Sequence, residues 1–279
     1  MTSKFSSRGR QASNKPTSSN AKKPFKKGRK KTYTKPQTSK ASTSEGIRLN
    51  KYIANAGICS RREADVFIAA GNAQVNDKTV TEMGYKVLAN DVVKFDGAVI
   101  SPESKRYLLL NKPKNYITTM DDERGRKTVM ELVAHAAPER LYPVGRLDRN
   151  TTGLLLFTND GELTKKLTHP KYNVKKLYHA SLDKKLKLAD LQKIAANFTL
   201  EGKMVFVDDI SYITNEPKTE VGIQIHSGRN RIVRKIFEHF GYKVVKLDRV
   251  VFAELTKKNL PRGRFRMLTN QEVINLKML

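Results

Sequence analysis

The residue in this sequence best suited to chemistry is Asp148, which lies between two arginines in the run Gly-Arg-Leu-Asp-Arg at positions 145–149. The apolar residues 154–157 follow closely and predict a buried strand, so the acid stands at the edge of structured chain. Flanking cations favour the ionised carboxylate, which is the form that a nucleophile requires. A salt-bridged loop aspartate is the alternative interpretation, and for an isolated Arg-Leu-Asp triplet it is the commoner one.

Two further segments carry side chains that could contact a substrate. Tyr178 lies in a stretch with strand-like alternation, where a tyrosine is more often a core or interface aromatic. Arg229, Arg231 and Arg234, followed by Lys235, place four cations in seven residues at the start of a predicted helix. The helix dipole disfavours cations at that end, whereas RNA phosphates would attract them. Arg234 is one step from the apolar stripe of the helix, so it could point inward and would then need an anionic partner.

The charge of the chain indicates a polyanionic partner. The 279 residues carry a formal net charge of +27, and the isoelectric point is near 10.1. Nucleic acid is the leading candidate. A membrane is the rival, but no apolar run approaches the roughly 20 residues that a spanning helix needs, and there is no signal-peptide core. The sequence therefore predicts a cytoplasmic protein without membrane contact, and nothing in it demands more than a monomer.

The residue types that metal and nucleotide sites require are sparse. One cysteine and five scattered histidines exclude a cysteine-based zinc cluster and show no HExxH spacing. The phosphate-binding patterns GxxxxGK[ST] and GxGxxG are also missing. We therefore expect neither a metal nor a cofactor.

Residues 1–46 form a low-complexity stretch with 13 Lys or Arg and one acid, which gives this segment +12 of the total charge. Its aromatic residues are too few to form a core, so the sequence predicts a disordered basic tail. Such a tail could be a solubilising arm. Because the rest of the chain is already strongly basic, an electrostatic tether to RNA phosphates is the favoured interpretation.

Residues 47–101 predict a small domain of two short helices and several strands. Ser60 and Glu63 form a capping-box pattern that begins the second helix. Arg61 and Arg62 follow in its first turn, where the helix dipole disfavours cations and where contact with RNA phosphates would explain them. We predict a basic RNA-binding face that consists of Arg48, Lys51, Arg61, Arg62 and Lys78.

This region resembles the S4 RNA-binding domain. The match rests on Arg-Leu-Asn-Lys-Tyr at 48–52, Ser-Arg-Arg-Glu-Ala at 60–64 and Val-Asn at 75–76. The family usually has aspartate where Asn50 stands, and this departure does not touch the basic face.

From residue 106 to the C-terminus the sequence predicts an α+β domain. Apolar stretches at 107–110, 154–157 and 243–252 indicate strands, and amphipathic stretches at 188–198 and 233–240 indicate helices. The elements are mixed without regular βαβ alternation, which is typical of the α+β class.

Taken in order, the segments of this domain closely resemble the pseudouridine synthases, in particular the branch of ribosomal RNA enzymes that carry an S4 domain. The resemblance includes Leu-Asn-Lys-Pro-Lys at 110–114 and Asp-Glu-Arg-Gly-Arg at 122–126, and it is most specific in the eleven residues 145–155. Asn115 stands where the family usually has glycine. The resemblance implies a small S4 domain followed by a catalytic domain, residues 106–279, with a mixed or antiparallel sheet.

The resemblance also implies roles for three residues. Asp148 would be the nucleophile, Tyr178 would stack on the uracil and could take part in proton transfer, and Arg234 would pair with Asp148 and hold it ionised. The reaction breaks the N1–C1′ bond of uridine, rotates the base and rejoins it through C5, so no cofactor is needed. Whether Asp148 attacks C1′ or C6 is left open.

A target uridine must leave its stack to reach such a pocket, which costs a few kcal/mol that binding energy has to offset. We expect Arg146 or Arg149 to fill the vacated space or grip a phosphate. Arg229 and Arg231 are expected to hold the RNA backbone.

Residues 157–163, Phe-Thr-Asn-Asp-Gly-Glu-Leu, look closest to the large-subunit enzymes of this family, which favours one uridine of 23S rRNA as the target and pre-ribosomal particles as a further partner. The small-subunit enzymes share the catalytic motifs, so 16S rRNA is the alternative. A non-catalytic S4-type assembly factor would explain the basicity but not Asp148, Tyr178 and Arg234 in matching contexts. Glycoside hydrolysis normally needs a second carboxylate, whereas Asp160 and Glu162 look like the N-cap and first turn of a helix.

Overall fold

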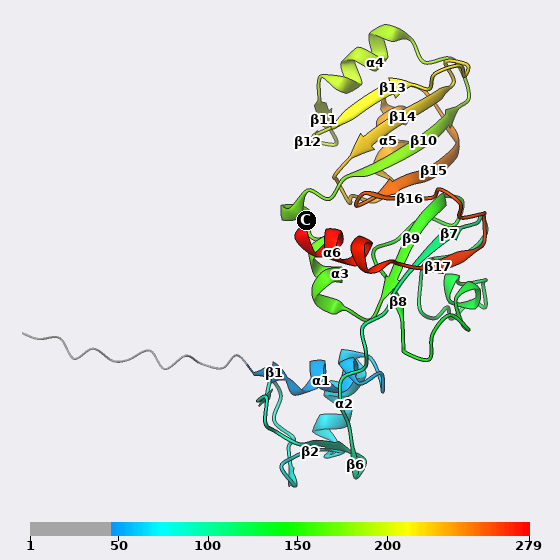
Figure 1. Ribbon diagram of the computed structural model, residues 1–279. Helices are drawn as coiled ribbons and strands as arrows, with labels where there is room; N and C mark the ends of the chain where they lie inside the picture. The colour runs from blue at the N-terminus through cyan, green and yellow to red at the C-terminus, as the bar shows by residue number, and fades with distance from the viewer. Residues whose placement is uncertain (1–45) are drawn as a thin grey trace, which may run out of the picture. The chain divides into compact units, whose positions relative to one another are not determined.

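The computed structural model describes residues 46–279 (Figure 1). The predicted basic tail, residues 1–46, lies outside the described residues except for Gly46. One cluster of buried apolar side chains consists only of residues between Leu49 and Phe95, and two others consist only of residues from Tyr107 onward. Each of these two parts of the chain therefore has its own core.

The first part begins with two short helices, which are followed by short strands. Its elements are β1 Ile47–Arg48, α1 Leu49–Asn55, α2 Arg61–Ala69, β2 Ala73–Val75, β3 Lys78–Thr79, β4 Lys86–Val87, β5 Val93–Phe95 and β6 Ala98–Val99. The Ser60 hydroxyl accepts a hydrogen bond from the backbone N of Glu63, whose carboxylate accepts one from the backbone N of Ser60. This confirms the predicted capping box, and it places Arg61 and Arg62 in the first turn of α2.

Two small antiparallel sheets accompany these helices. Strand β1 pairs with β4, and the other sheet has the order β3-β2-β5-β6. Asp96 and Gly97 join β5 to β6 with φ angles of 48° and 80°. Two successive positive φ angles are what a tight hairpin turn of this kind requires, and Asp-Gly is a favoured pair for it.

The second part is built on one large sheet. Its elements are β7 Tyr107–Lys112, η1 Val129–Leu132, β8 Tyr142–Pro143, β9 Thr152–Thr158, α3 Gly161–Thr168, η2 Pro170–Tyr172, β10 Lys176–Leu182, α4 Leu188–Ala195, β11 Phe198–Leu200, β12 Lys203–Val205, β13 Asp209–Tyr212, β14 Glu220–Ile225, α5 Ile232–His239, β15 Val244–Phe252, β16 Leu255–Thr256, β17 Phe265–Met267 and α6 Asn270–Met278. The sheet has the order β13-β14-β10-β15-β9-β7-β17, and only β15 and β9 run parallel. The predicted α+β class with a mixed sheet is confirmed. In residues 46–279 no helix has the length and apolar composition needed to cross a membrane.

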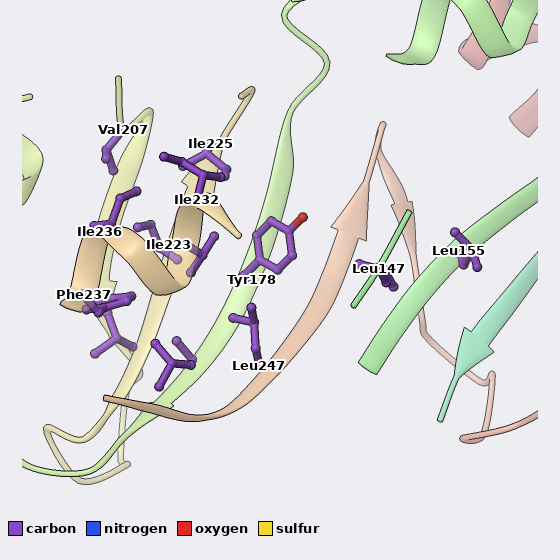
Figure 2. Packing of buried hydrophobic residues seen from close by; sticks show 14 of the residues in the cluster. Leu147, Leu155, Tyr178, Val207, Ile223, Ile225, Ile232, Ile236, Phe237 and Leu247 are labelled. Atoms are coloured by element: carbon purple, nitrogen blue, oxygen red, sulfur yellow. The ribbon is translucent and has the colours of Figure 1, made fainter. Parts of the chain in front are cut away.

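Helix α5 covers one face of the sheet where β10, β14 and β15 lie side by side (Figure 1). Ile232, Ile236 and Phe237 of this helix are buried in the same cluster as Ile223 and Tyr178 of the strands. Figure 2 shows the Tyr178 ring between the α5 residues on one side and Leu147 and Leu155 on the other, with its hydroxyl directed away from α5. The apolar cluster thus fixes the ring of a tyrosine whose hydroxyl has no hydrogen-bond partner among residues 46–279.

Strands β9 and β15 connect the two halves of the sheet through two residue pairs, Thr152 with Asp248 and Gly153 with Arg249. A Cβ atom at Gly153 would lie 2.2 Å from the carbonyl oxygen of Arg249, so only glycine permits this approach. Asp248 reinforces the connection, because its carboxylate accepts a hydrogen bond from the Thr152 hydroxyl at 2.8 Å. The same carboxylate pairs with Arg262 at 2.9 Å and with Lys257.

Replacing Asp248 with asparagine is expected to lower the free energy of unfolding by about 2 kcal/mol at pH 7. Burial raises the pKa of Asp248, but hydrogen bonds from Arg262, Lys257 and Thr152 outweigh this and lower the pKa to about 2. A lowered carboxyl pKa gives stability that is present above the ordinary value of 3.8 and is lost as the pH falls towards 2. Urea unfolding at several pH values should therefore show wild type and Asp248→Asn converging between those limits. A constant difference, or the same loss in the exposed control Asp209→Asn, would contradict this assignment.

Candidate active site

The three segments that the sequence analysis selected meet at one cleft of about 480 Å³. Its walls come from residues 144–149, from Lys176 and Tyr178 of β10, and from residues 227–233. The volume lies in the range of small-molecule sites. Asp148, Tyr178 and Arg231 therefore share a space that could hold one nucleotide.

The loop that carries Asp148 is fixed through its backbone, and the carboxylate is left accessible. The carbonyl oxygen of Asp148 accepts hydrogen bonds from the backbone N of Thr151 at 3.0 Å and from the ammonium of Lys112 at 3.1 Å. The preceding Leu147 is buried, and its carbonyl oxygen accepts a hydrogen bond from the Thr118 hydroxyl at 2.9 Å. The Asp148 side chain itself is 36% exposed. Such a loop holds the carboxylate in place and open to a substrate.

Lys112 is a fully buried residue at the end of β7. Its ammonium donates hydrogen bonds to the carbonyl oxygens of Pro113, Asp148 and Thr151, at 3.1, 3.1 and 2.9 Å. Burial lowers the pKa of Lys112 to about 8, an effect that the charge of Asp148 opposes. Lys112 belongs to the stretch 110–114 that resembles the family, but the sequence predicted no role for it. The available signal was a lysine directly after a buried strand, because such a charge needs polar partners.

The cation that pairs with Asp148 is Arg231, not the predicted Arg234. The Nη1 atom of Arg231 lies 3.5 Å from Oδ2 of Asp148. Arg231 is the N-cap residue of α5 and has a φ angle of 50°, in the left-handed region. That conformation is costly for a residue with a Cβ atom, and such residues cluster at functional sites. That Arg231 also holds the RNA backbone stays a prediction; in this structure its guanidinium contacts the acid.

Arg234 lies behind this pair, in the first turns of α5. It is 8% exposed, and its Nη1 atom donates a hydrogen bond to the carbonyl oxygen of Val244 at 2.7 Å. Burial and the charge of Arg231 lower the pKa of Arg234, whereas Asp148 raises it. Within residues 46–279 it forms no ion pair with Asp148, so the predicted direct pair is wrong in this structure. The physical reason is that α5 turns this side chain towards the backbone of β15, from where it can act on Asp148 only through its field.

Tyr178 takes the predicted position on a cleft wall, and two cations accompany it that sequence reasoning did not assign. Lys176 and Arg249 both line the cleft next to Tyr178. Lys176 precedes Tyr178 by two residues, so strand alternation places both on the same face of the sheet. That spacing was a usable signal for Lys176, whereas Arg249 could be found only from the pairing of β10 with β15.

Most of the remaining basic residues are exposed, as contacts with RNA require. Arg146, Arg149 and Arg229 are exposed and line the cleft. In the first part of the chain, Lys51 is half-buried, and the exposed members of the predicted basic face are Arg48, Arg61, Arg62 and Lys78. Contact between these side chains and RNA stays a prediction.

Residues 106–239 match the family described as RNA pseudouridylate synthase, and residues 47–93 match the S4 domain. The protein named ribosomal large subunit pseudouridine synthase B of Bacillus subtilis (strain 168) is 40% identical over 235 residues, which are 83% of this chain and 96% of that protein. This chain belongs to the RNA pseudouridylate synthase family. It is an RNA-modifying isomerase with an S4 domain, as the sequence predicted.

Two further comparisons agree with the family. The dual-specificity RNA pseudouridine synthase RluF of Escherichia coli (strain K12) is 36% identical over 233 residues, 82% of this chain and 78% of that protein. A solved structure of a pseudouridylate synthase has 27% sequence identity and a TM-score of 0.59, and it covers 82% of this chain and 99% of its own. The fold described above is therefore that of a pseudouridine synthase.

Proposed function

We propose that this protein converts one uridine of 23S ribosomal RNA to pseudouridine, with Asp148 as the nucleophile. The observation that carries the proposal is an accessible carboxylate, paired with Arg231 in a nucleotide-sized cleft that Tyr178 also lines, in a member of this enzyme family. The large-subunit assignment rests on the name of the Bacillus relative and on the likeness of residues 157–163 to large-subunit enzymes.

The geometry supports a division of work within the site. Arg231 contacts the carboxylate of Asp148 directly and orients it, and the buried Arg234 adds a second positive charge to this part of the site. Lys112 holds the backbone of the loop, so the carboxylate meets the nucleotide in one orientation. The Tyr178 ring, fixed by its apolar neighbours, presents a surface on which the uracil stacks.

We further propose that residues 47–101 act as the S4 RNA-binding domain and residues 106–279 as the catalytic domain of a monomer that works in the cytoplasm. The separate apolar cores support these boundaries.

Tritium release measures the choice of substrate, because the reaction replaces the C5–H bond of uridine with a C5–C1′ bond. Unmodified 23S and 16S transcripts labelled with tritium at C5 of uridine are incubated separately with the purified protein. Release of one equivalent from 23S RNA and none from 16S RNA is expected. Tritium release from 16S RNA alone would overturn the large-subunit assignment. The proposed function would be overturned if no tritium were released from the 23S transcript, the 16S transcript or bulk small RNA.

Replacing Arg229 with alanine is expected to weaken RNA binding and to flatten its salt dependence by about one unit in the plot of log K against log salt. Arg229 is exposed at the cleft and has no carboxylate within ion-pair distance in the described part of the chain, so a phosphate is its expected partner. Filter binding between low and moderate salt gives the slope. Arg231→Ala is the matched variant, and it should slow the reaction more than it changes the slope. Equal slopes for wild type and Arg229→Ala would rule out the phosphate contact.

A further inference from the structure

A half-buried cation, Lys176, and a buried one, Arg249, both line the cleft with Tyr178, and no role has been given to either of them so far. Lys176 and Tyr178 project from the same face of β10, because they are two residues apart on one strand. Arg249 of β15 is the residue directly opposite Tyr178 in the antiparallel pairing. On its other side Arg249 pairs with Gly153 of β9, and a glycine contributes no side chain next to Arg249. The wall of the cleft therefore carries Lys176, Tyr178 and Arg249 together.

Both cations are held by backbone carbonyl oxygens, and both keep a hydrogen-bond donor in reserve. The ammonium of Lys176 donates to the carbonyl oxygens of Val174 at 3.0 Å and of His226 at 2.7 Å, which leaves one of its three N–H groups. Arg249 is 3% exposed, and its Nε atom donates to the carbonyl oxygen of Leu154 at 2.8 Å. Its Nη2 atom is buried and has no hydrogen-bond partner among residues 46–279. An unmade hydrogen bond of this kind is costly unless a ligand completes it.

No carboxylate of residues 46–279 forms an ion pair with either cation. Asp148 pairs with Arg231, and Asp208 pairs with His226. Burial lowers the pKa of Lys176 to about 8, the charge of Arg249 lowers it further, and Asp208 raises it. Two like charges in a desolvated position are unfavourable on their own, so the arrangement fits a ligand that brings negative charge.

We propose that Lys176 and Arg249 donate hydrogen bonds to the carbonyl oxygens of the target uracil and stabilise the negative charge that the ring acquires during the reaction. This inference rests on the proposed function and adds two catalytic residues to it. The pair has the role of an oxyanion hole, with donors fixed before the charge develops.

The charge arises on either route that is open to Asp148. If Asp148 bonds to C1′, the N1–C1′ bond breaks and its electron pair stays on the ring, where it spreads over N1, O2 and O4. If Asp148 bonds to C6, the electrons of the C5–C6 double bond move towards O4, and the N1–C1′ bond then breaks with its electron pair on N1. In both cases the ring turns, C5 bonds to C1′, the bond from Asp148 breaks, C5 loses a proton and N1 gains one. The balance needs no oxidant and no second substrate.

The depth of the two cations favours the base over a phosphate as their ligand. Arg249 is almost fully buried beside the tyrosine on which the uracil is proposed to stack. The exposed residues Arg146, Arg149 and Arg229 also line the cleft, and they suit the phosphates, because the RNA backbone keeps its water and remains at the surface. A base that has left its stack is the part of the nucleotide that reaches the buried wall.

The first test is the single-turnover rate of Lys176→Met with the RNA that wild type modifies. The rate should fall by roughly 10²–10³-fold, the range for losing one such donor, while RNA affinity stays within about threefold. Arg249→Lys keeps the charge but loses the second donor, and it should cost roughly 10²-fold. Lys175→Met is the matched control, because Lys175 is the exposed neighbour of Lys176. Melting temperature and RNA binding show whether each variant is folded.

The second test is the pH profile of Lys176→Arg. The groups around Lys176 are Arg249 on β15, Asp208 before β13 and His226 after β14, with Asp148 and Arg231 also lining the cleft. The wild-type rate should fall as the pH rises through about 8, because the ammonium is then lost. Arginine stays protonated, so in Lys176→Arg the fall should move up by at least about one pH unit.

The pKa of Lys112 is also lowered to about 8, so the pH profile of wild type alone does not tell which lysine is responsible. The profile of Lys176→Arg separates the two lysines. If wild type forms pseudouridine, and Lys176→Met keeps its rate or Lys176→Arg keeps the wild-type profile, the role of Lys176 is overturned and the proposed function stands. An Arg249→Lys variant at the wild-type rate would remove Arg249 in the same way. If wild type forms no pseudouridine in any RNA, the proposed function fails and this inference fails with it.

Discussion

Asp148→Asn is expected to slow pseudouridine formation by at least roughly 10⁴-fold, as the loss of a nucleophile does in other enzymes. Asparagine has nearly the same shape but carries no charge, so it can neither form the covalent bond nor stabilise a broken glycosidic bond. The loop should keep its structure, because the bonds to Thr151 and Lys112 use the backbone carbonyl of residue 148. Single-turnover kinetics with excess enzyme measures the rate, and filter binding should give an RNA affinity within about threefold of wild type.

Two controls make this result specific. Asp209→Asn changes an exposed acid elsewhere in the same domain and should leave the rate unchanged. Asp148→Ala excludes a residual rate that comes from slow deamidation of the asparagine. A rate for Asp148→Ala within about tenfold of wild type would mean that another group is the nucleophile.

Lys112→Met is expected to lower both the stability of the protein and the rate of the reaction. The substitution leaves the carbonyl oxygens of Pro113, Asp148 and Thr151 without their shared donor, at a cost of about 3 kcal/mol in the free energy of unfolding. The released loop no longer holds the carboxylate in one place, and a displacement of about 1 Å can cost roughly 10²-fold in rate. Urea unfolding and single-turnover kinetics measure the two effects on the same preparation.

Lys114→Met is the matched control for Lys112→Met, because Lys114 is exposed two residues further along the chain. It should change neither quantity. If Lys112→Met loses stability but keeps the wild-type rate, then Lys112 supports the fold without positioning Asp148. If Lys112→Met keeps both the stability and the rate of wild type, the buried ammonium of Lys112 has no part in holding the loop.

The sequence predicted the members of the site better than their contacts. Asp148 and Tyr178 were found because their segments combine charged or polar residues with apolar strands, and the structure brings these segments to one cleft. Periodicity placed Arg234 next to the apolar stripe, and its burial is confirmed. It could not show that Arg231 takes a left-handed φ of 50° and turns its guanidinium to Asp148, because a single backbone angle leaves no trace in residue spacing.

The fold was predictable where caps and turns are local. Ser60 and Glu63 start α2 as expected, and Asn115 adopts a φ angle of 71°, a left-handed conformation that asparagine tolerates in place of the glycine usual in this family. The predicted helix face ending at Phe198 was too long, because α4 ends at Ala195 and Asn197, with a φ angle of 60°, leads the chain into β11.

Long-range pairing explains the residues that sequence reasoning missed. Arg249 reaches the site only because β15 lies between β10 and β9 in the sheet, and sequence spacing does not reveal that order. Two of the partners of Lys112 are the backbone carbonyls of Asp148 and Thr151, which are 36 and 39 residues away and carry no side-chain signature.

Mapping of pseudouridine in ribosomal RNA tests the central claim most directly. RNA from a strain that lacks this protein is incubated with wild type or with Asp148→Asn, and each pseudouridine is located chemically. We predict that wild type restores one modification in 23S rRNA and that Asp148→Asn restores none. A pseudouridine formed at that position by the Asp148→Asn protein would contradict the account.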